Sequence, residues 1–448
     1  MSVPGAGAPS AAAPAAAVPP DAAPSGESAG YRRYVLALLL AVYVSNFVDR
    51  QVLSVLLQAI KREFAFSDTQ LGLLGGIAFA LFYSLVGLPL AVLADRINRR
   101  NLIAVALALW SLMTAACGYA GGFVSLFLCR VGVGIGEAGG MPPSYSLISD
   151  YFPPARRGTA LAVFGMGIPL GVLTGFLLGG WVNEYYGWRT AFQVVGIPGI
   201  VLALLIAATL REPPRGRYDP APPPGAAPSI LATARFLWAR RAVRHLCAAG
   251  ALYGLAMWGA GVWQPAFFMR VHGMSSAQVG TWLALVFGLS GASGALLGGA
   301  LGDRLYRASG DARWYAWISA GGVLVSVPFV FLVYLWPTPI PALLFLIVPT
   351  IFGHMYLGPA FALLLGMAGP RRRAVASSLY GLVLNLVSMG LGPLLVGFSS
   401  DRLQPRYGAL ALRYSILVLV VTATAWAAIH FLCAARTLRA DLEAAEAD

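Results

Sequence analysis

Apolar residues fill twelve long runs of this chain, and short polar segments separate the runs. Every run has at least 20 residues. An α-helix of that length, rising about 1.5 Å per residue, spans the ~30 Å core of a bilayer. The pattern therefore predicts an all-α membrane protein with twelve transmembrane helices. The runs cover residues 32–58, 70–94, 101–120, 122–149, 158–181, 188–210, 243–269, 276–301, 314–336, 340–367, 374–400 and 409–435.

Longer polar segments precede and divide these runs. Residues 1–30 are mostly Ala, Pro, Gly and Ser, without the basic start and apolar core of a signal peptide, so we expect a disordered cytoplasmic tail. Residues 211–242 form a cytoplasmic linker between two six-helix bundles, at 31–210 and 243–436, and residues 437–448 form a second tail. The stretch 230–244 mixes apolar residues with arginines, which is typical of an amphipathic helix on the inner leaflet or of a plain solvated linker.

Basic residues indicate how the chain is oriented. Segments on the side of the termini carry 22 arginines, whereas the opposite side carries 7 Lys or Arg residues and two arginines lie within runs. Because Lys and Arg concentrate in cytoplasmic loops, we expect a multi-pass protein of the cell (inner) membrane with both termini in the cytoplasm. An even number of spans also requires the termini to share a side.

Composition argues against several other classes of protein. Hydrophobic residues make up 58% of the chain and charged residues 11%, whereas a soluble domain has about 25% charged residues. The formal charge of +13 sits mainly between the runs, so it indicates membrane topology and no nucleic-acid partner. Metal-ligand spacings and phosphate loops are missing from the sequence, and the one G-x-S-x-G match lies at 26–30 in the predicted tail. We therefore expect no enzyme, cofactor or metal site, and the polar tails are too short for the signalling domain of a sensor.

The two predicted bundles share short sequence features. Leu93-Ala94-Asp95-Arg96 follows the second run, and Leu301-Gly302-Asp303-Arg304 follows the eighth, 208 residues later. Duplicated halves of this kind build the midplane site of many secondary transporters. The spacing D-R-x-x-R-R, with Gly165 to Gly171 in the fifth run, resembles the major facilitator superfamily. The resemblance implies alternating access of two bundles and a cytoplasmic gate, although Ala91 and Asn98 replace family glycines. The gate would consist of Asp95, Arg96, Arg99 and Arg100.

A second resemblance involves the first and fourth runs. Asn46 to Gln51, with the sequence N-F-V-D-R-Q, and Arg130 to Gly140, with R-V-G-V-G-I-G-E-A-G-G, are together similar to the Spinster family. That resemblance implies transport of lysophospholipids or of sphingosine 1-phosphate. Symporters of hexuronates and related organic anions share the shorter G-x-G-E-A piece, so a proton-coupled organic-anion symporter is the alternative.

Asp49, Arg130 and Glu137 place charge at membrane depth. Each such group costs at least ~2.5 kcal/mol, so it normally faces a partner or a polar cavity. Arg130 and Glu137 are about two turns apart on one helix face. A carboxylate whose arginine partner moves away in one conformation can take up a proton there and release it in the other. We expect Asp49 and Glu137 to be proton-responsive, with Arg130 and also Arg50 as movable partners; a static Asp49–Arg130 clamp is the alternative.

Further candidates for substrate contact are polar and aromatic residues within the runs. They are Asn46, Arg50, Tyr145, Ser146, Trp258, Trp263, Gln264, His354, Tyr380 and Asn385. Aromatic residues in membrane helices more often pack or anchor the helix at the interface. The second bundle carries little charge within its runs, which favours a lipid with a long apolar tail over a sugar acid.

These features together predict a secondary active transporter. The predicted substrate is a lysophospholipid or a related amphipathic lipid, moved by alternating access with proton coupling. The expected partners are this substrate, protons and the lipid bilayer, and the expected oligomeric state is a monomer.

Overall fold

The computed structural model describes residues 28–218, 229–369 and 371–447. Most of the predicted N-terminal tail and the middle of the linker lie outside these residues. Ten helical stretches are long and apolar enough to cross a membrane. Two of them, Pro154–Thr209 and Arg373–Ala444, each contain two spans, which meet at Gly187 and at Gly408–Leu410. The described residues therefore contain the twelve predicted spans, and the prediction of an all-α membrane protein is confirmed.

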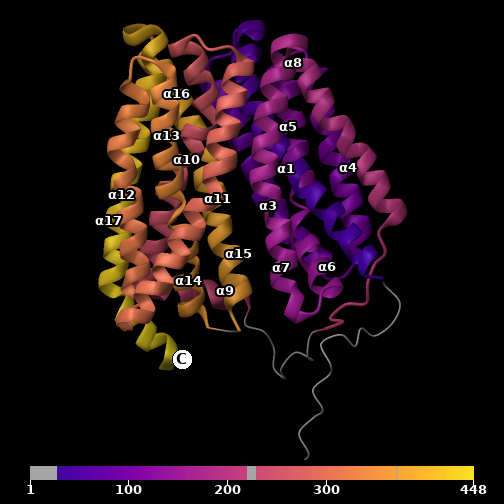
Figure 1. Cartoon of the computed structure of the whole chain (residues 1–448), viewed down its shortest axis with the longest axis vertical. Coiled ribbons are helices and arrows are strands. Elements are labelled where there is room, and N and C mark those ends of the chain that lie inside the picture. Colours follow the sequence, from indigo (N-terminus) through magenta and orange to yellow (C-terminus); the bar gives the residue numbers. More distant parts are fainter. Residues whose placement is uncertain (1–27, 219–228, 370, 448) are drawn as a thin grey trace, which may run out of the picture.

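The spans form two bundles that stand side by side (Figure 1). The N-terminal half consists of α1 (Ala29–Phe64), α2 (Asp68–Gly75), α3 (Ile77–Ala94), α4 (Arg99–Cys117), α5 (Phe123–Glu137), α6 (Met141–Tyr151), α7 (Pro154–Gly165) and α8 (Gly167–Thr209). The short α9 (Ile230–Ala239) lies between the halves in sequence. The C-terminal half consists of α10 (Arg241–His272), α11 (Ser276–Ser309), α12 (Arg313–Leu335), α13 (Pro339–His354), α14 (Leu357–Ala368), α15 (Arg373–Leu384), η1 (Asn385–Leu391), α16 (Gly392–Tyr407), η2 (Gly408–Leu410) and α17 (Ala411–Ala447). Residues 437–447, predicted as a tail, continue α17.

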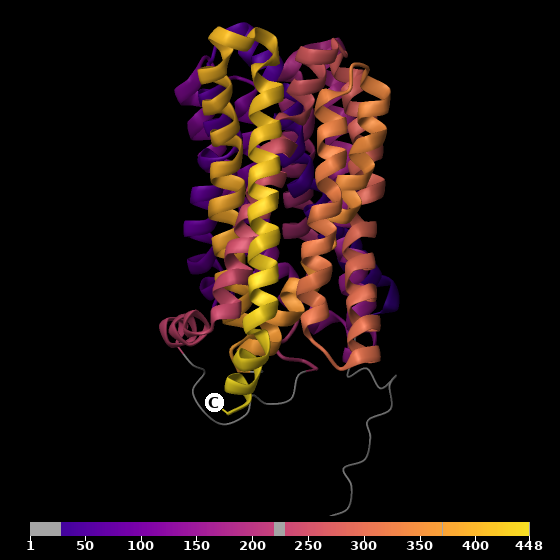
Figure 2. The same cartoon turned by 90° about the vertical axis from the view of Figure 1, so that its left-hand side faces the viewer.

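Both described ends of the chain lie at one end of the molecule, which we call the termini end (Figures 1 and 2). The opposite end, where α2 begins and α10 meets α11, is called the far end. Several spans are interrupted between these ends. The second span breaks at Gly76, the fourth at residues 138–140, and the eleventh contains the π-helix η1. Irregular backbone at membrane depth is tolerated where it is buried in protein or lines a cavity, so these breaks mark the interior of the molecule.

Glycines let the two halves approach closely in the part of the molecule near the far end. A Cβ atom on Gly180 of α8 would lie 2.5 Å from the Ser276 carbonyl oxygen, and one on Gly280 of α11 would lie 2.4 Å from that of Phe176. A Cβ atom on Gly72 of α2 would likewise lie 2.5 Å from the Pro393 carbonyl oxygen. Small residues at these crossings allow backbone-to-backbone contact, which is how membrane helices pack most tightly.

Hydrogen bonds between the halves also gather at the far end. The Asp68 carboxylate accepts two bonds from Arg270 (Nη1–Oδ2 2.7 Å and Nη2–Oδ1 2.9 Å) and one from Ser400 (2.6 Å). In return, Asp401 accepts bonds from the backbone N–H groups of Asp68 (2.9 Å) and Thr69 (2.7 Å). We call Asp68, Thr69, Arg270, Ser400 and Asp401 the Asp68 latch.

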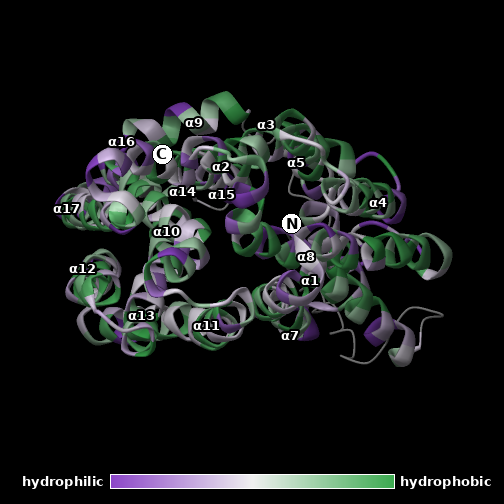
Figure 3. Ribbon diagram, turned by 90° about the horizontal axis from the view of Figure 1, so that it is seen from above, coloured by the Kyte–Doolittle hydropathy of each residue, from purple (hydrophilic) through white to green (hydrophobic). Residues whose placement is uncertain are grey.

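Buried apolar residues also connect the two halves mainly at the far end. One cluster at the far end draws on both halves and includes Leu56 and Trp263. Toward the termini end there are two clusters, one around Trp110 in the N-terminal half and one around Tyr380 in the C-terminal half. Met389 of the C-terminal half belongs to the cluster around Trp110. The two groups of helices are also visible along the bundle axis (Figure 3). The halves therefore share a core at the far end and pack separately near the termini end.

Candidate functional site

A cluster of buried charges lies within the N-terminal half, between α1 and α5. Glu137, the last residue of α5, is fully buried, and its Oε2 accepts hydrogen bonds from Arg50 Nε (2.8 Å) and from Asn46 Nδ2 (2.8 Å). Asn46 and Arg50 are four residues apart on α1, so one helix face supplies both donors. We call Asn46, Asp49, Arg50, Arg130 and Glu137 the buried charge cluster.

The glycines of α5 explain how a charged helix end reaches this position. A Cβ atom on Gly134 would lie 2.6 Å from the Phe79 carbonyl oxygen of α3, and one on Gly136 would lie 2.7 Å from the Trp110 nitrogen of α4. Because these positions lack side chains, α5 packs directly against both neighbours and carries Glu137 toward α1. The helix then ends at the break of residues 138–140.

Phe79 of α3 brings the two arginines of the cluster together. The Cζ atom of Arg50 lies 4.9 Å from the centre of the Phe79 ring, and that of Arg130 lies 5.3 Å from it. Arg50 also lies over Tyr83, at 5.0 Å. A guanidinium over an aromatic face gains about 0.5–2 kcal/mol, most when desolvated. The ring therefore helps to hold two positive charges in a buried place.

Hydrogen bonds are distributed unevenly over the cluster. Arg130 is 3% exposed, and its Nε and Nη1 have no hydrogen-bond partner among the described residues. The same holds for both carboxylate oxygens of Asp49, which is 1% exposed and lies within electrostatic reach of Arg130, Glu137 and Arg50. The cluster thus combines a bonded Arg50–Glu137 pair with an Arg130 and an Asp49 that keep free bonding capacity.

The structure brings Asp49, Arg130 and Glu137 into one site, as the coupling hypothesis requires. Of the two arginines expected as partners, Arg50 is the one that is hydrogen-bonded to Glu137 in this conformation. The alternative of a static Asp49–Arg130 clamp finds no hydrogen bond in this conformation, since the Asp49 carboxylate accepts none from the described residues. The proton-coupling roles of these residues stay predictions.

Three of the other predicted contact residues are packed inside the C-terminal half. The indole N–H of Trp263 donates to the Pro393 carbonyl (2.8 Å), and Gln264 Oε1 accepts a bond from the Tyr334 hydroxyl (2.7 Å). Tyr380 is buried with its ring edge against Phe361. These positions stabilise the bundle, and they lie away from the buried charge cluster.

The remaining predicted residues differ in exposure and in their partners. Tyr145 is 45% exposed, and Ser146 accepts a bond from Arg99 (2.7 Å). His354 bonds through Nδ1 to the Thr350 carbonyl of its own helix (2.5 Å). Two residues lie closer to the region between the halves. Trp258 packs on the N-terminal cluster around Trp110, and Asn385 opens η1, which contacts α3.

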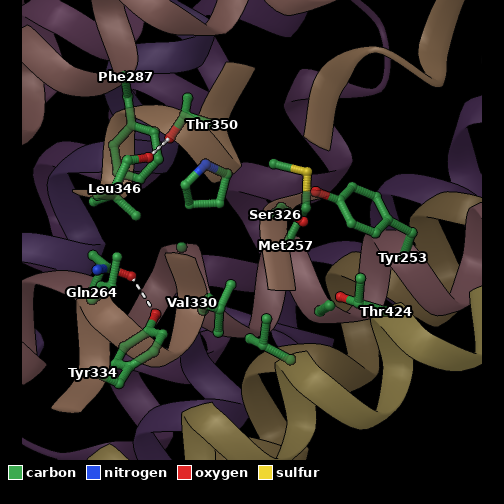
Figure 4. Close-up of a pocket in the computed structure, with 16 residues that line it drawn as sticks. Tyr253, Met257, Gln264, Phe287, Ser326, Val330, Tyr334, Leu346, Thr350 and Thr424 are labelled. Atoms are coloured by element: carbon green, nitrogen blue, oxygen red, sulfur yellow. Dashed lines mark hydrogen bonds between the residues drawn. The ribbon is translucent and has the colours of Figure 1, made fainter. Parts of the chain in front are cut away.

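A small cavity lies inside the C-terminal half, between α10, α12, α13 and α17 (Figure 4). Its volume is about 70 Å³. Apolar side chains such as Val330 and Leu346 alternate on its wall with the hydroxyl groups of Tyr334 and Thr350. The Nε2 atom of Gln264, also on the wall, has no hydrogen-bond partner among the described residues. The cavity is therefore mainly apolar with a few polar groups.

Arg99, predicted as a gate residue, connects the N-terminal half to the linker. It is 1% exposed and donates to Glu212 (Nε–Oε1 2.6 Å) and to Asp150. Its Nη2 also donates to the Pro213 carbonyl (3.1 Å). A buried arginine with two carboxylate partners and a carbonyl is well compensated.

The other gate residues surround this contact at the termini end. The backbone N–H of Arg100 donates to Glu212 Oε2 (3.1 Å), whereas Asp95 and Arg96 are exposed. Arg215 of the linker donates a hydrogen bond to the carbonyl of Ala94, the last residue of α3 (2.9 Å). In this conformation the described contacts of the motif lie within the N-terminal half and the linker, and its gating role stays a prediction.

Sequence reasoning missed the Asp68 latch. Ser67 and Gln70 form a capping box, so the sequence around Asp68 signals the start of a helix and an acid in its first turn. The partners of Asp68 lie 202 residues away at Arg270 and 332 residues away at Ser400. Nothing local in the sequence connects these positions.

Comparisons with known proteins agree with this arrangement. A family model described as Major Facilitator Superfamily matches residues 39–393. An MFS-type efflux pump of Mycolicibacterium smegmatis is 35% identical over 91% of this chain and 93% of its own length. Protein spinster homolog 1 of Homo sapiens is 29% identical over 85% of this chain and 75% of its own length. A crystal structure of a bacterial homologue of the human lysosomal transporter Spinster, inward-facing and unoccupied, is 33% identical with a TM-score of 0.83, covering 93% of this chain and 99% of that chain. The chain therefore belongs to the major facilitator superfamily and is a secondary transporter related to the Spinster proteins.

Proposed function

We propose that the protein moves a lysophospholipid or a related amphipathic lipid across the membrane by alternating access, coupled to protons. One observation carries the proposal, namely the uneven pairing in the buried charge cluster. Glu137 is bonded to Arg50, whereas Arg130 and Asp49 keep unpartnered atoms beside it. Buried charges without partners are costly, so the site is prepared for a group that supplies the missing bonds.

Arg130 is the residue proposed to bind the lipid head group. A guanidinium stays charged at all relevant pH values and binds phosphate through two parallel hydrogen bonds. The Nε and Nη1 of Arg130 have no hydrogen-bond partner among the described residues, so this guanidinium has unused donors for a phosphate group. Phosphate bound there would compete with Asp49 and Glu137 for positive charge, and a proton on either carboxylate would restore the balance. Binding of the phosphate and protonation of a carboxylate would thereby favour one another at a single site.

In this proposal the lipid tail lies against the C-terminal half, whose cavity of about 70 Å³ would take only a small part of it. The cavity between α10, α12, α13 and α17 is lined mainly by apolar side chains. A sugar acid, by contrast, needs a charged partner for its carboxylate, and no charged side chain of the described residues lines this cavity. These observations favour an amphipathic lipid over the organic-anion alternative.

The arginine distribution suggests which side of the membrane the site faces in this conformation. If the arginine-rich termini end is cytoplasmic, the Asp68 latch and the shared core lie on the outer side, and the conformation would be inward-facing. The related bacterial structure described above is likewise inward-facing. Transport would then require the latch to open while the termini ends of the two halves come together.

The proposal is tested in proteoliposomes that carry an imposed pH gradient. We expect the gradient to drive movement of a fluorescent lysophospholipid and not of glucuronate. Asp49→Asn and Glu137→Gln should each abolish the gradient-driven part, because neither amide can bind or release the proton. Arg130→Ala should remove the lysophospholipid-induced rise in the melting temperature of the purified protein.

Asp303→Asn is the matched control, since Asp303 is an exposed carboxylate at the termini end and bonds to Tyr315. This variant should keep full coupling. Full coupling in both Asp49→Asn and Glu137→Gln would refute the proton-binding role, and gradient-driven uptake of glucuronate alone would replace the lipid with the organic anion.

A further inference from the structure

The short helix α9 lies across the ends of the spans at the termini end. It begins at its N-cap Ser229 and ends at Ala239, directly before α10 begins at Arg241. Figures 2 and 3 show its axis roughly perpendicular to those of the spans. Because α10 enters the membrane immediately after it, α9 lies at the level of the bilayer surface.

One face of α9 is fixed to the C-terminal half. Thr233 and Leu237 are buried there. Between them in sequence, the ring of Phe236 lies between two guanidinium groups, with Arg240 Cζ 3.5 Å and Arg372 Cζ 3.7 Å from its centre. Arg372 precedes α15, so this stacked arrangement joins α9 to the start of that helix.

The opposite face of α9 is apolar and exposed. Leu231 is 60% exposed and Trp238 is 63% exposed, and Ile230 at the start of the helix is 43% exposed. Positions 231, 235 and 238 follow the spacing of one helix face. Trp is the residue most typical of the membrane interface, where its ring sits at the level of the lipid head groups. A large apolar face next to a membrane span is therefore suited to the bilayer surface.

Positive charge surrounds this apolar face. Arg235 lies on it and is exposed, and Arg371 and Arg373 are exposed beside Arg372 in the adjoining loop. Arg240 is buried and donates to the Phe236 carbonyl (2.7 Å), and its positive charge makes an anion beside the more exposed Arg372 favourable. The Nε of Arg372 also has no hydrogen-bond partner among the described residues. Basic residues near a membrane surface attract anionic lipid.

We propose that α9 and the loop of Arg371 to Arg373 form a docking surface for anionic phospholipid head groups of the bilayer leaflet at the termini end. This surface is separate from the buried charge cluster and from the transported substrate. It combines an apolar helix face that enters the leaflet with arginines that bind the phosphate groups. Bound lipid would hold α9, and through Phe236 the start of α15, at a fixed depth.

Quenching of Trp238 fluorescence by brominated lipids tests the proposal. The full-length protein is reconstituted into phosphatidylcholine–phosphatidylglycerol vesicles in which either the glycerol lipid or the choline lipid, at equal mole fraction, carries brominated chains. The Trp238→Phe variant gives the signal of the other tryptophans, which is subtracted. We expect brominated phosphatidylglycerol to quench Trp238 more strongly than brominated phosphatidylcholine, and high salt to reduce this ratio.

Two double variants separate binding from folding. Arg240→Gln/Arg372→Gln removes the stacked pair, and Arg235→Gln/Arg371→Gln removes exposed charges that contribute little to packing. Both should bring the quenching ratio toward one. The control Arg33→Gln/Arg304→Gln removes two exposed charges elsewhere at the termini end and should leave the ratio high. A ratio of one in the unaltered protein, or a high ratio kept in the Arg235→Gln/Arg371→Gln variant, would overturn the proposal.

Discussion

At the scale of single residues, two buried arginines differ in what surrounds them. Arg50 has a carboxylate partner in Glu137 and three aromatic rings within 5.2 Å of its Cζ atom. Arg130 shares one of these rings, that of Phe79, but its Nε and Nη1 have no hydrogen-bond partner among the described residues. The guanidinium of Arg50 is thus bonded to a carboxylate, whereas that of Arg130 keeps donors available for a ligand.

Arg50→Lys should destabilise the protein although it keeps the charge. Lysine has no Nε–H in the position that bonds Glu137 and no flat group to lie on Phe79, so we expect a loss of about 1–2 kcal/mol in the free energy of unfolding. The melting temperature of the protein in detergent reports this loss. Arg189→Lys is the control, because Arg189 forms a comparable pair with Glu63 at 40% side-chain exposure, where such pairs contribute about 0–1 kcal/mol. Equal shifts in both variants would contradict the special role of the Arg50 site.

The sequence allowed the members of this site to be predicted, but not its pairing. Asp49, Arg130 and Glu137 are conspicuous because charge is rare inside apolar runs. Which arginine meets Glu137 depends on how α1 is rotated against α5. That rotation follows from packing of α1 on α8 and of α5 on α3 and α4, which no local pattern encodes. Asp68 was missed for the same reason, since its partners come from the other half of the chain.

At the scale of elements, close packing through glycine explains both the spans and their breaks. The twelve spans could be predicted because each apolar run is long enough to cross the bilayer. In the fourth span, Pro142 and Pro143 directly follow the break at residues 138–140. The π-helix η1 contains no proline, and it forms where Gly390 faces α3 and Gly392 packs on α10. Such a distortion depends on tertiary contacts.

Two neighbouring glycines of α11 give a direct test of this packing. A Cβ atom on Gly298 would lie 2.0 Å from the Met355 carbonyl oxygen, whereas one on Gly299 would have nothing within 4 Å. Gly298→Ala should force α11 away from the α13–α14 break and lower the free energy of unfolding by about 1–3 kcal/mol. Gly299→Ala should leave it unchanged or raise it by up to about 1 kcal/mol, because alanine favours the helix. Chemical denaturation of the two variants side by side measures the difference, and similar values for both would show that the crossing tolerates a methyl group.

At the scale of the whole molecule, the two halves are joined unevenly. They share a core and the Asp68 latch at the far end, whereas near the termini end their buried clusters are nearly separate. The linker is bonded to the N-terminal half through Arg99 and Glu212. Two rigid bundles that are held at one end can rock about the region between them, which is the motion that alternating access requires. The free energy of the latch then sets how often the far end opens.

Asp68→Asn should shift this balance toward opening of the far end. The Asp68 side chain is 3% exposed and bonds Arg270 twice, Ser400 once and Lys61 at 2.5 Å. Removing its charge leaves two cations near an amide, and loss of one partner of such a buried pair costs about 2–5 kcal/mol. About 2.7 kcal/mol already changes an equilibrium a hundredfold. Spin labels at Thr159 of α7 and Ser378 of α15, both exposed at the termini end, should therefore show a new population at shorter distance. Asp303→Asn, which removes an exposed carboxylate far from the latch, should leave the distances unchanged. If the folded Asp68→Asn protein keeps the original distances, the latch does not determine which end is open, and the shared apolar core at the far end must do so.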